Sequence, residues 1–149
     1  EKATHYQHSE VGYNYRMSNI LAGIGRGQIE IIDKRIAARR ANFEFYKEHL
    51  ASTDIEFLQE PEGCFSNRWL TCIVTKSLKQ RKNICFNLEN ENIEARPLWK
   101  PMHLQPIFKH YPNFTTGISE NLFEKGLCLP SGSNLTEDDL NRVVSAIKS

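Results

Sequence analysis

The sequence lacks three features that would place it in a special class of protein. It has no block of Lys and Arg residues, because 19 basic residues are balanced by 18 acidic ones for a net charge of +1. This balance argues against a nucleic-acid-binding surface. No run approaches the roughly 18 consecutive apolar residues of a membrane-spanning helix, and the first residues lack the apolar region of a signal peptide. We therefore expect a cytoplasmic protein with neither nucleic acid nor a membrane as its partner.

The sequence also lacks the cysteine spacing of the common zinc sites. The four cysteines are Cys64, Cys72, Cys85 and Cys128. None of them lies in a Cys-x-x-Cys or Cys/His pattern, so we expect reduced thiols. His5 and His8 lie close together, but no carboxylate or cysteine stands at ligand spacing from them, and no metal site is expected.

What the chain does contain is the composition of one globular domain. Its 149 residues are 40% hydrophobic and 25% charged, and a domain of this size can bury a core. The chain starts at Glu1 rather than at Met and reaches a motif-rich stretch almost at once. We therefore expect it to be a piece of a longer protein.

Residues 12–19, Gly-Tyr-Asn-Tyr-Arg-Met-Ser-Asn, form that motif-rich stretch and run directly into an apolar helical pattern. Ser18 or Asn19 is placed to cap the helix. A helix start offers free backbone N–H groups and partial positive charge, so an arginine and amides beside it suit an anion such as phosphate. The alternative is an ordinary capped helix with tyrosines packed on its side, and these residues alone leave both readings open.

Three glycines follow within this first helical pattern, at Gly23, Gly25 and Gly27. The dinucleotide-binding fingerprint requires G-x-G-x-x-G after a buried strand, whereas here the spacing is G-x-G-x-G inside a helix. Close packing of the helix against a neighbour is the better explanation for these glycines.

A long helix is predicted over residues 29–50, from apolar residues at three- and four-residue spacing. It would have about 22 residues and span roughly 33 Å. The opposite face carries charged residues including Lys34, Arg40 and Glu44, which indicates a solvated face.

The rest of the chain alternates between predicted strands and helices. We expect strands over residues 69–74, 93–98 and 127–129, and helices over residues 78–88, 119–125 and a final stretch capped by Thr136 with Asp139. The first strand is apolar on both faces and should be central, whereas Pro97 puts the second strand at an edge or ends it. This order predicts an α/β fold with helices packed on a short sheet.

Residues 97–106 form a stiff loop that follows the second of these strands. Its prolines fix backbone angles around Trp99, Lys100 and His103, so these side chains can bind a ligand with less loss of entropy. The alternative is that Trp99 fills the edge of the core while Lys100 and His103 stay in solvent.

Three stretches, in this order, resemble the DegT/DnrJ/StrS family of pyridoxal-phosphate-dependent sugar aminotransferases. The first is residues 12–25, which extends the motif above. The second is residues 94–103, Glu-Ala-Arg-Pro-Leu-Trp-Lys-Pro-Met-His, and the third is residues 125–132, Lys-Gly-Leu-Cys-Leu-Pro-Ser-Gly. Residues 66–70, Ser-Asn-Arg-Trp-Leu, are similar to the branch that aminates UDP-linked 4-keto-6-deoxy-N-acetylhexosamines, the bacillosamine type.

The resemblance implies the small C-terminal domain of a fold type I aminotransferase, with a short, mainly antiparallel sheet and packed helices. Residues 1–17 would be the connector from a large cofactor-binding domain, and residues 18–149 the small domain, including the long helix 29–50. Family members are much longer, and their cofactor-bound lysine lies in the large domain. Lys100 corresponds to the substrate side instead, so no catalytic residue is expected in this chain, and the chain alone should be inactive.

Site residues follow from the resemblance at matching positions only. Asn14, with Tyr13 and Arg16, looks like the group that reaches the phosphate of pyridoxal phosphate in the neighbouring subunit of a homodimer. The substrate-side residues would be Trp99, Lys100, His103 and Arg68, with the nucleotide sugar as their ligand. The implied reaction transfers an amino group, with glutamate as the donor, to a UDP-linked 4-keto sugar in the synthesis of cell-surface polysaccharide or glycan.

Two other functions stay open at this point. Some members of the family are sugar dehydratases in which histidine replaces the lysine, and that position is not in this chain. A non-catalytic module that binds nucleotide sugars is the third hypothesis, since no catalytic constellation is present. For the isolated chain, we also expect exposed apolar surface and therefore self-association.

Overall fold

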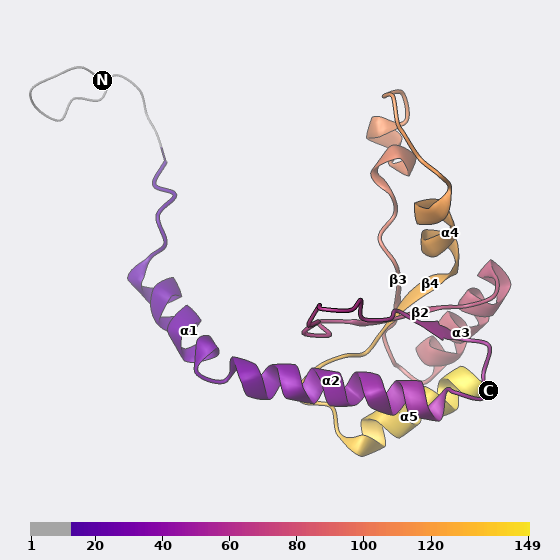
Figure 1. Ribbon diagram of the computed structural model, residues 1–149, viewed down its shortest axis with the longest axis horizontal. Helices are drawn as coiled ribbons and strands as arrows, with labels where there is room; N and C mark the ends of the chain where they lie inside the picture. The colour runs from indigo at the N-terminus through magenta and orange to yellow at the C-terminus, as the bar shows by residue number, and fades with distance from the viewer. Residues whose placement is uncertain (1–12) are drawn as a thin grey trace, which may run out of the picture. The chain divides into compact units, whose positions relative to one another are not determined.

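The computed structural model describes residues 13–149 of the chain (Figure 1). The chain divides into two compact units, Glu1–Ile32 and Asp33–Ser149. His5, His8, Gly12 and most of the predicted connector lie outside the described residues. Residues 13–18 form an irregular segment that leads into the first helix.

The first unit contains one described helix, α1 (Asn19–Ile29). Ser18 is its N-cap, as predicted, and the Ser18 Oγ accepts a hydrogen bond of 3.2 Å from the Leu21 backbone N–H. No side chain of α1 is buried, and a Cβ atom added at Gly23, Gly25 or Gly27 would meet no heavy atom within 4 Å. The close packing expected at these glycines has no partner within the described part of the first unit, residues 13–32, and stays a prediction.

The predicted helix over residues 29–50 is wrong at its start. Ile29 ends α1, two turn residues follow, and the long helix α2 runs only over Ile32–His49. The Ile31 backbone N–H is bonded to the Gln28 carbonyl, a tight turn that interrupts the α-helical pattern. The β-branched isoleucines around this turn and the glycines before it lower the local helix propensity, which a period-based prediction does not see.

The second unit is built on a four-stranded antiparallel sheet with the order β1-β2-β4-β3. Its strands are β1 (Glu56–Phe57), β2 (Thr71–Val74), β3 (Arg96–Pro97) and β4 (Gly126–Leu129). The predicted central strand is confirmed as β2, and Pro97 lies in the edge strand β3 as expected. Strand β1 was not predicted, because two paired residues leave no periodic signal.

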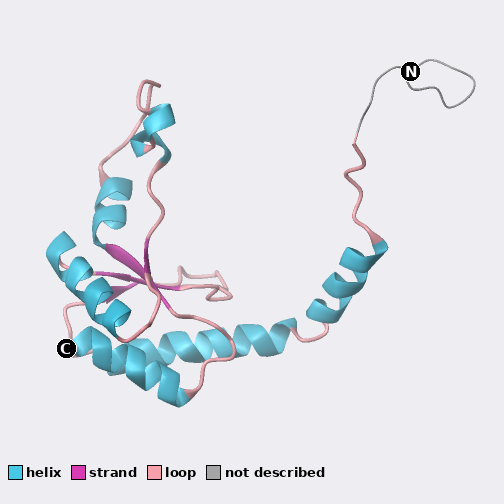
Figure 2. Cartoon of the chain, turned by 180° about the vertical axis from the view of Figure 1, so that it is seen from behind, coloured by secondary structure: helices cyan, strands magenta, loops and turns pink. Residues whose placement is uncertain are grey.

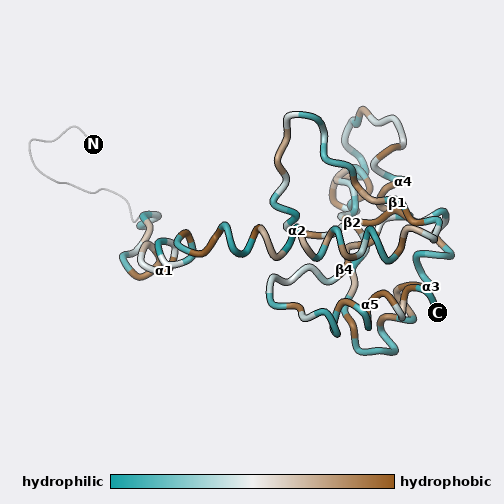
Figure 3. The backbone as a smooth tube through the Cα atoms, turned by 60° about the horizontal axis from the view of Figure 1, so that its bottom comes forward, coloured by the Kyte–Doolittle hydropathy of each residue, from teal (hydrophilic) through white to brown (hydrophobic). Residues whose placement is uncertain are grey.

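Three further α-helices complete this unit: α3 (Leu78–Asn90), α4 (Ile118–Lys125) and α5 (Glu137–Lys148). Two short 3-10 helices, Met102–Leu104 and Pro106–Phe108, lie between β3 and α4. The capping box of α5 is confirmed, because Thr136 and Asp139 exchange side-chain-to-backbone hydrogen bonds. Figure 2 shows the helices and strands of this arrangement, and in Figure 3 hydrophobic and hydrophilic residues alternate along α5.

The core forms where α2, α3 and α5 meet one face of the sheet. Tyr46, Leu50, Ile73, Leu88 and Leu127 are completely buried at its centre, and α5 contributes a buried stripe that includes Leu140, Val143, Val144 and Ile147. The predicted fold class, a small α/β domain with a short antiparallel sheet and packed helices, is confirmed. Within residues 13–149, no helix has the length and apolar character that a membrane span requires.

Candidate functional site

A pocket of about 500 Å³ lies on the second unit, beside the end of β4 and the edge strand β3. Residues from three parts of the chain line it: Trp69, Leu70, Glu94, Arg96, Pro97, Trp99, Cys128, Leu129, Pro130 and Ser131. All of these residues fall in the three stretches that the sequence singled out on the second unit, residues 66–70, 94–103 and 125–132. The fold therefore gathers motifs that are far apart in the sequence around one cavity.

Two tryptophans form the aromatic part of this pocket. The ring centroids of Trp69 and Trp99 are 6.0 Å apart, with their planes tilted by 32°. Both side chains are exposed, at 60% and 65%. Exposed indole faces of this kind offer a stacking surface for a planar ring such as a nucleotide base.

Trp69 is positioned by a polar clamp between α2 and the segment before β2. Arg40 binds the Glu60 carboxylate through two N–O contacts of 3.1 Å and donates a 2.6 Å hydrogen bond to the Ser66 carbonyl. The Ser66 backbone N–H also donates to Glu60, and Arg39 donates to the Trp69 carbonyl. Hydrogen bonds from Arg40 and from the Ser66 backbone lower the pKa of Glu60 to about 2. The prediction of a solvated face for α2 is thus wrong at Arg40, because this side chain binds Glu60 and Ser66 in the segment before β2.

Arg68, one of the predicted substrate residues, packs inside the second unit. It is buried, and its guanidinium lies 3.7 Å from the centroid of the Phe43 ring. It also donates a 3.0 Å hydrogen bond to the Leu58 carbonyl and lies 3.9 Å from Glu60. Its backbone φ of 49° is left-handed, and this turn carries the chain from the loop toward Trp69. Arg68 does not line the pocket and shapes it only through Trp69.

Trp99 is positioned by the end of the edge strand. The Leu98 backbone N–H donates to the Gly126 carbonyl at 3.2 Å, which extends the pairing of β3 with β4 by one residue. Leu98 passes so close that a Cβ atom at Gly126 would lie 2.2 Å from its Cδ1. A glycine at the start of β4 therefore lets the chain before Trp99 lie against the sheet.

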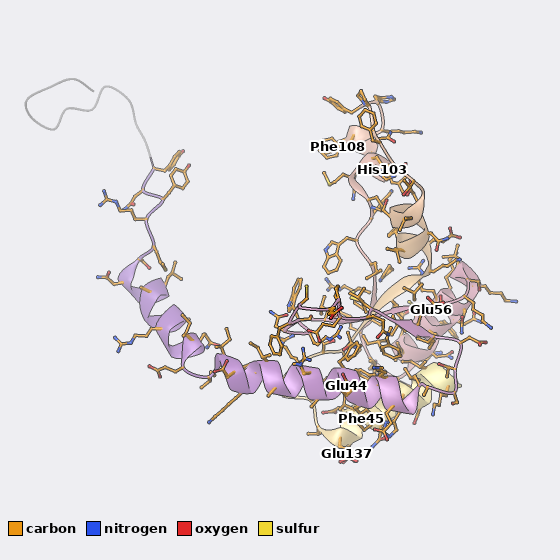
Figure 4. All side chains as sticks on the ribbon, viewed as in Figure 1. Glu44, Phe45, Glu56, His103, Phe108 and Glu137 are labelled. Carbon is orange, nitrogen blue, oxygen red and sulfur yellow. The ribbon has the colours of Figure 1, made fainter. Side chains whose placement is uncertain are left out.

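After Trp99 the chain makes an excursion over residues 100–117 before returning as α4. Figure 4 shows His103 and Phe108 near the end of this excursion that lies away from the sheet. His103 Nε2 lies 2.8 Å from the Glu120 carboxylate on α4, and Ser119 donates to the other oxygen of Glu120. The pKa of Glu120 is lowered, chiefly by its own backbone N–H and further by Ser119 and His103.

The structure brings only one of the four predicted substrate residues into the pocket. Trp99 lines it, Lys100 is exposed next to it, and His103 is engaged with α4. Sequence reasoning missed Trp69 and Arg96 as pocket residues. The signal for both was present, because they lie in the stretches that carried the resemblance, but Trp69 was interpreted as the start of a strand. The Arg96 Nε donates to Glu94 at 2.7 Å, so a charged pair borders the indoles.

Tyr13, Asn14 and Arg16, the predicted cofactor residues, lie in the first unit and are exposed. The Arg16 backbone N–H donates to the Asn14 Oδ1 at 3.0 Å, and the Tyr13 and Tyr15 rings meet edge to face. Because the Asn14 oxygen is already bonded, its NH₂ group is the part left for a ligand. This NH₂ group, the Arg16 guanidinium and the tyrosine hydroxyls are all donors, which is the set that fits a phosphate.

The four cysteines carry free thiols, as expected. Within residues 13–149, His, Cys, Asp and Glu side chains do not gather in a group of three or more that could hold a metal ion. The candidate binding groups among the described residues are the hydrogen-bond donors of residues 13–16 and the pocket lined by Trp69 and Trp99.

Comparison with known proteins gives consistent matches over nearly the whole chain. The model of the DegT/DnrJ/EryC1/StrS aminotransferase family matches residues 1–148. EpsN of Bacillus subtilis (strain 168), which is named as a pyridoxal phosphate-dependent aminotransferase, is 49% identical over 152 residues, covering 99% of this chain and 39% of EpsN. GDP-perosamine synthase of Vibrio cholerae is 36% identical over 146 residues, covering 96% of this chain and 40% of that enzyme.

A solved structure agrees with these relatives. The crystal structure of a DegT DnrJ EryC1 StrS aminotransferase from Brucella abortus aligns with a TM-score of 0.82 at 26% identity, covering 97% of this chain and 39% of that one. The chain thus spans 39% to 40% of the length of these three proteins.

Proposed function

The chain belongs to the DegT/DnrJ/EryC1/StrS aminotransferase family, and from that membership we propose that it is the C-terminal part of a nucleotide-sugar aminotransferase. The observation that carries the proposal is the family match over residues 1–148. The reaction proposed is transfer of an amino group, with glutamate as donor, to a 4-keto-6-deoxy nucleotide sugar. The product would serve the synthesis of cell-surface polysaccharide or glycan.

The cofactor of this family is pyridoxal phosphate, and residues 13–16 would contribute to its phosphate site. Asn14 would donate its NH₂ group and Arg16 its guanidinium. One such hydrogen bond to a charged phosphate contributes roughly 1.5–3 kcal/mol. When bound, pyridoxal phosphate supplies the electron sink for amino transfer, while the protein binds, orients and shields the reacting groups. The role proposed for this unit is to hold the phosphate of a cofactor that is bound mainly by other residues.

The pocket of the second unit would bind the nucleotide end of the sugar substrate. Trp69 and Trp99 would stack on the base, and Arg96, with Lys100 just outside the pocket, would face the diphosphate. Guanidinium and ammonium groups suit phosphate oxygens. UDP is the nucleotide that the resemblance to the bacillosamine-type branch implies, and GDP is the alternative suggested by the perosamine synthase relative.

A homodimer is part of the proposal. Helix α1 has 11 residues, three glycines and no buried side chain, and an isolated helix of that length is marginal in water. Ile20, Leu21 and Ile24 are all more than half exposed on it. A second subunit that covers these residues would stabilise the helix and would place residues 13–16 at a shared site.

The test uses the intact protein that contains this chain. Glutamate is supplied with the UDP-linked or the GDP-linked 4-keto-6-deoxy sugar, and the products are identified by mass spectrometry. The proposal expects an amino sugar. A deoxygenated keto sugar would instead favour the dehydratase hypothesis, and binding without turnover would favour the non-catalytic module.

The variant Trp99→Ala tests the pocket within that assay. Base stacking contributes about 1–3 kcal/mol, so the KM for the nucleotide sugar should rise roughly 5- to 150-fold while the KM for glutamate stays unchanged. The matched control is Phe114→Ala, which removes a fully exposed aromatic side chain from the excursion that follows Trp99. Equal KM values for the two variants would contradict the role given to Trp99.

A further inference from the structure

Two thiols face each other across the middle of the sheet. Cys72 on β2 and Cys128 on β4 are directly paired in the antiparallel register. Their Sγ atoms lie 3.9 Å apart, and both thiols are free. Cys64 and Cys85, the remaining cysteines of residues 13–149, have no such sulfur neighbour within hydrogen-bonding distance.

The geometry of this pair is close to that of a disulfide. Side chains that are directly opposite in an antiparallel sheet have Cβ atoms about 4.5–5.5 Å apart, and a disulfide requires about 3.5–4.5 Å. The two Sγ atoms need to approach from 3.9 Å to about 2 Å. Small rotations of the side chains and a slight local adjustment of two adjacent strands supply this movement.

The pair lies on the face of the sheet away from the core. Ile73 and Leu127, the neighbours in sequence, are completely buried on the core face. Because side chains alternate between faces along a strand, Cys72 and Cys128 point to the other side. Cys128 lines the tryptophan pocket and is 8% exposed, whereas Cys72 is half-buried. Cys72 is therefore the thiol that a small reagent meets first.

We propose that Cys72 and Cys128 are a redox-sensitive dithiol, which a small-molecule disulfide oxidises to a cross-strand disulfide in the wall of the pocket. Cys72, the more exposed thiol, attacks one sulfur of the reagent, loses its proton and releases one small thiol. Cys128 then attacks the Cys72 sulfur of the mixed disulfide and releases the second small thiol. The two cysteines lose two electrons and two protons in total, and the reagent is reduced to two thiols.

The surroundings of the sulfurs make the first step of this oxidation slow. Burial raises the pKa of both thiols, and for Cys128, with Cys72 beside it, the value reaches about 12. The thiolate is the attacking form, so little of it is present at neutral pH. In the second step the short distance between the sulfurs compensates for the small fraction of thiolate, because Cys128 already lies beside the Cys72 sulfur.

The experiment treats the chain with oxidised glutathione and then alkylates the remaining thiols after unfolding. Peptide mass spectrometry should find one internal disulfide, between Cys72 and Cys128, whereas Cys64 and Cys85 should be alkylated or carry a single glutathione. The double variant Cys64→Ser/Cys85→Ser is the control and should form the same disulfide. Four alkylated cysteines after prolonged oxidation, or a disulfide between any other two residues, would overturn the proposal.

A second readout connects the disulfide to the pocket. Trp69 and Trp99 are the only tryptophans of the chain, and both line the same pocket as Cys128. Because a disulfide quenches indole fluorescence, oxidation should lower the emission, and dithiothreitol should restore it. The variant Cys72→Ser should show no such reversible change, and an equal change in that variant would refute the link to the pocket. This proposal does not depend on the proposed enzymatic activity, so each can fail without the other.

Discussion

Removing the hydroxyl group of Tyr46 should destabilise the second unit by a predictable amount. Tyr46 is completely buried in α2, and its hydroxyl donates a 3.0 Å hydrogen bond to the Pro130 carbonyl. Burial raises the pKa of this hydroxyl well above its ordinary value, so the neutral donor is maintained. The contact fixes the turn after β4, where Asn42 also donates to the Gly132 carbonyl at 2.9 Å. The turn borders the pocket, since Pro130 lines it.

The variant Tyr46→Phe keeps the ring and its packing but leaves the Pro130 carbonyl without this donor. The cost of an unpaired buried acceptor is about 1–3 kcal/mol, which corresponds to a decrease in melting temperature of about 4 °C or more for a domain of this size. Urea unfolding followed by circular dichroism measures the change in free energy, and an unchanged m-value would show that the unfolded state is unaffected.

The matched control for this prediction is Tyr111→Phe. The Tyr111 side chain is 65% exposed on the excursion, and its edge contact with the Phe108 ring survives the substitution. This variant should have the stability of the unmodified chain. If both variants have the same urea midpoint, the hydrogen bond from Tyr46 contributes no net stability and the reasoning above is refuted.

Two more predictions concern the clamp and the association of the chain. The folded-state pKa of Glu60 is lowered from 4.5 to about 2, first by its hydrogen bonds to Arg40, so its stabilising contribution is complete above pH 4.5 and is lost as the pH falls toward 2. The free energy of unfolding, measured as the pH is lowered from 4.5 toward 2, should show this loss. The variant Glu60→Gln should lack that part of the pH dependence. The chain should also self-associate at micromolar concentration through α1, and Ile24→Glu should weaken the association; a strictly monomeric species in sedimentation would contradict this.

The sequence predicted the second unit well because its strongest signals are local. Apolar periodicity located α3 and α5, Thr136 and Asp139 marked the start of α5, and Pro97 identified an edge strand. Each of these signals depends on neighbours within a few residues, so no tertiary information was needed. The break between α1 and α2 was missed because one apolar pattern continues across it, while propensity and turn formation decide where a helix stops.

The site was predicted only in part, because local sequence signals do not show which side chains meet in the folded chain. Trp99 was identified from a stiff loop and a family resemblance, and it lines the pocket. Arg68 and His103 were chosen by the same reasoning, yet the fold gives their side chains intramolecular partners in Phe43 and Glu120. A charged or aromatic residue in a motif can either bind a ligand or make contacts within the folded chain, and its sequence neighbours do not distinguish these two roles.

The sequence alone determined the family, the alternation of helices and strands, the capped entrance to α1 and the set of donors in residues 13–16. Only the tertiary structure decided that Trp69 joins Trp99, that Arg40 clamps Glu60, and that Cys72 faces Cys128. These contacts join positions that are 20 or more residues apart. Their physical origin is strand register and helix packing, and both are fixed by the burial of a common core that no short stretch of the sequence contains.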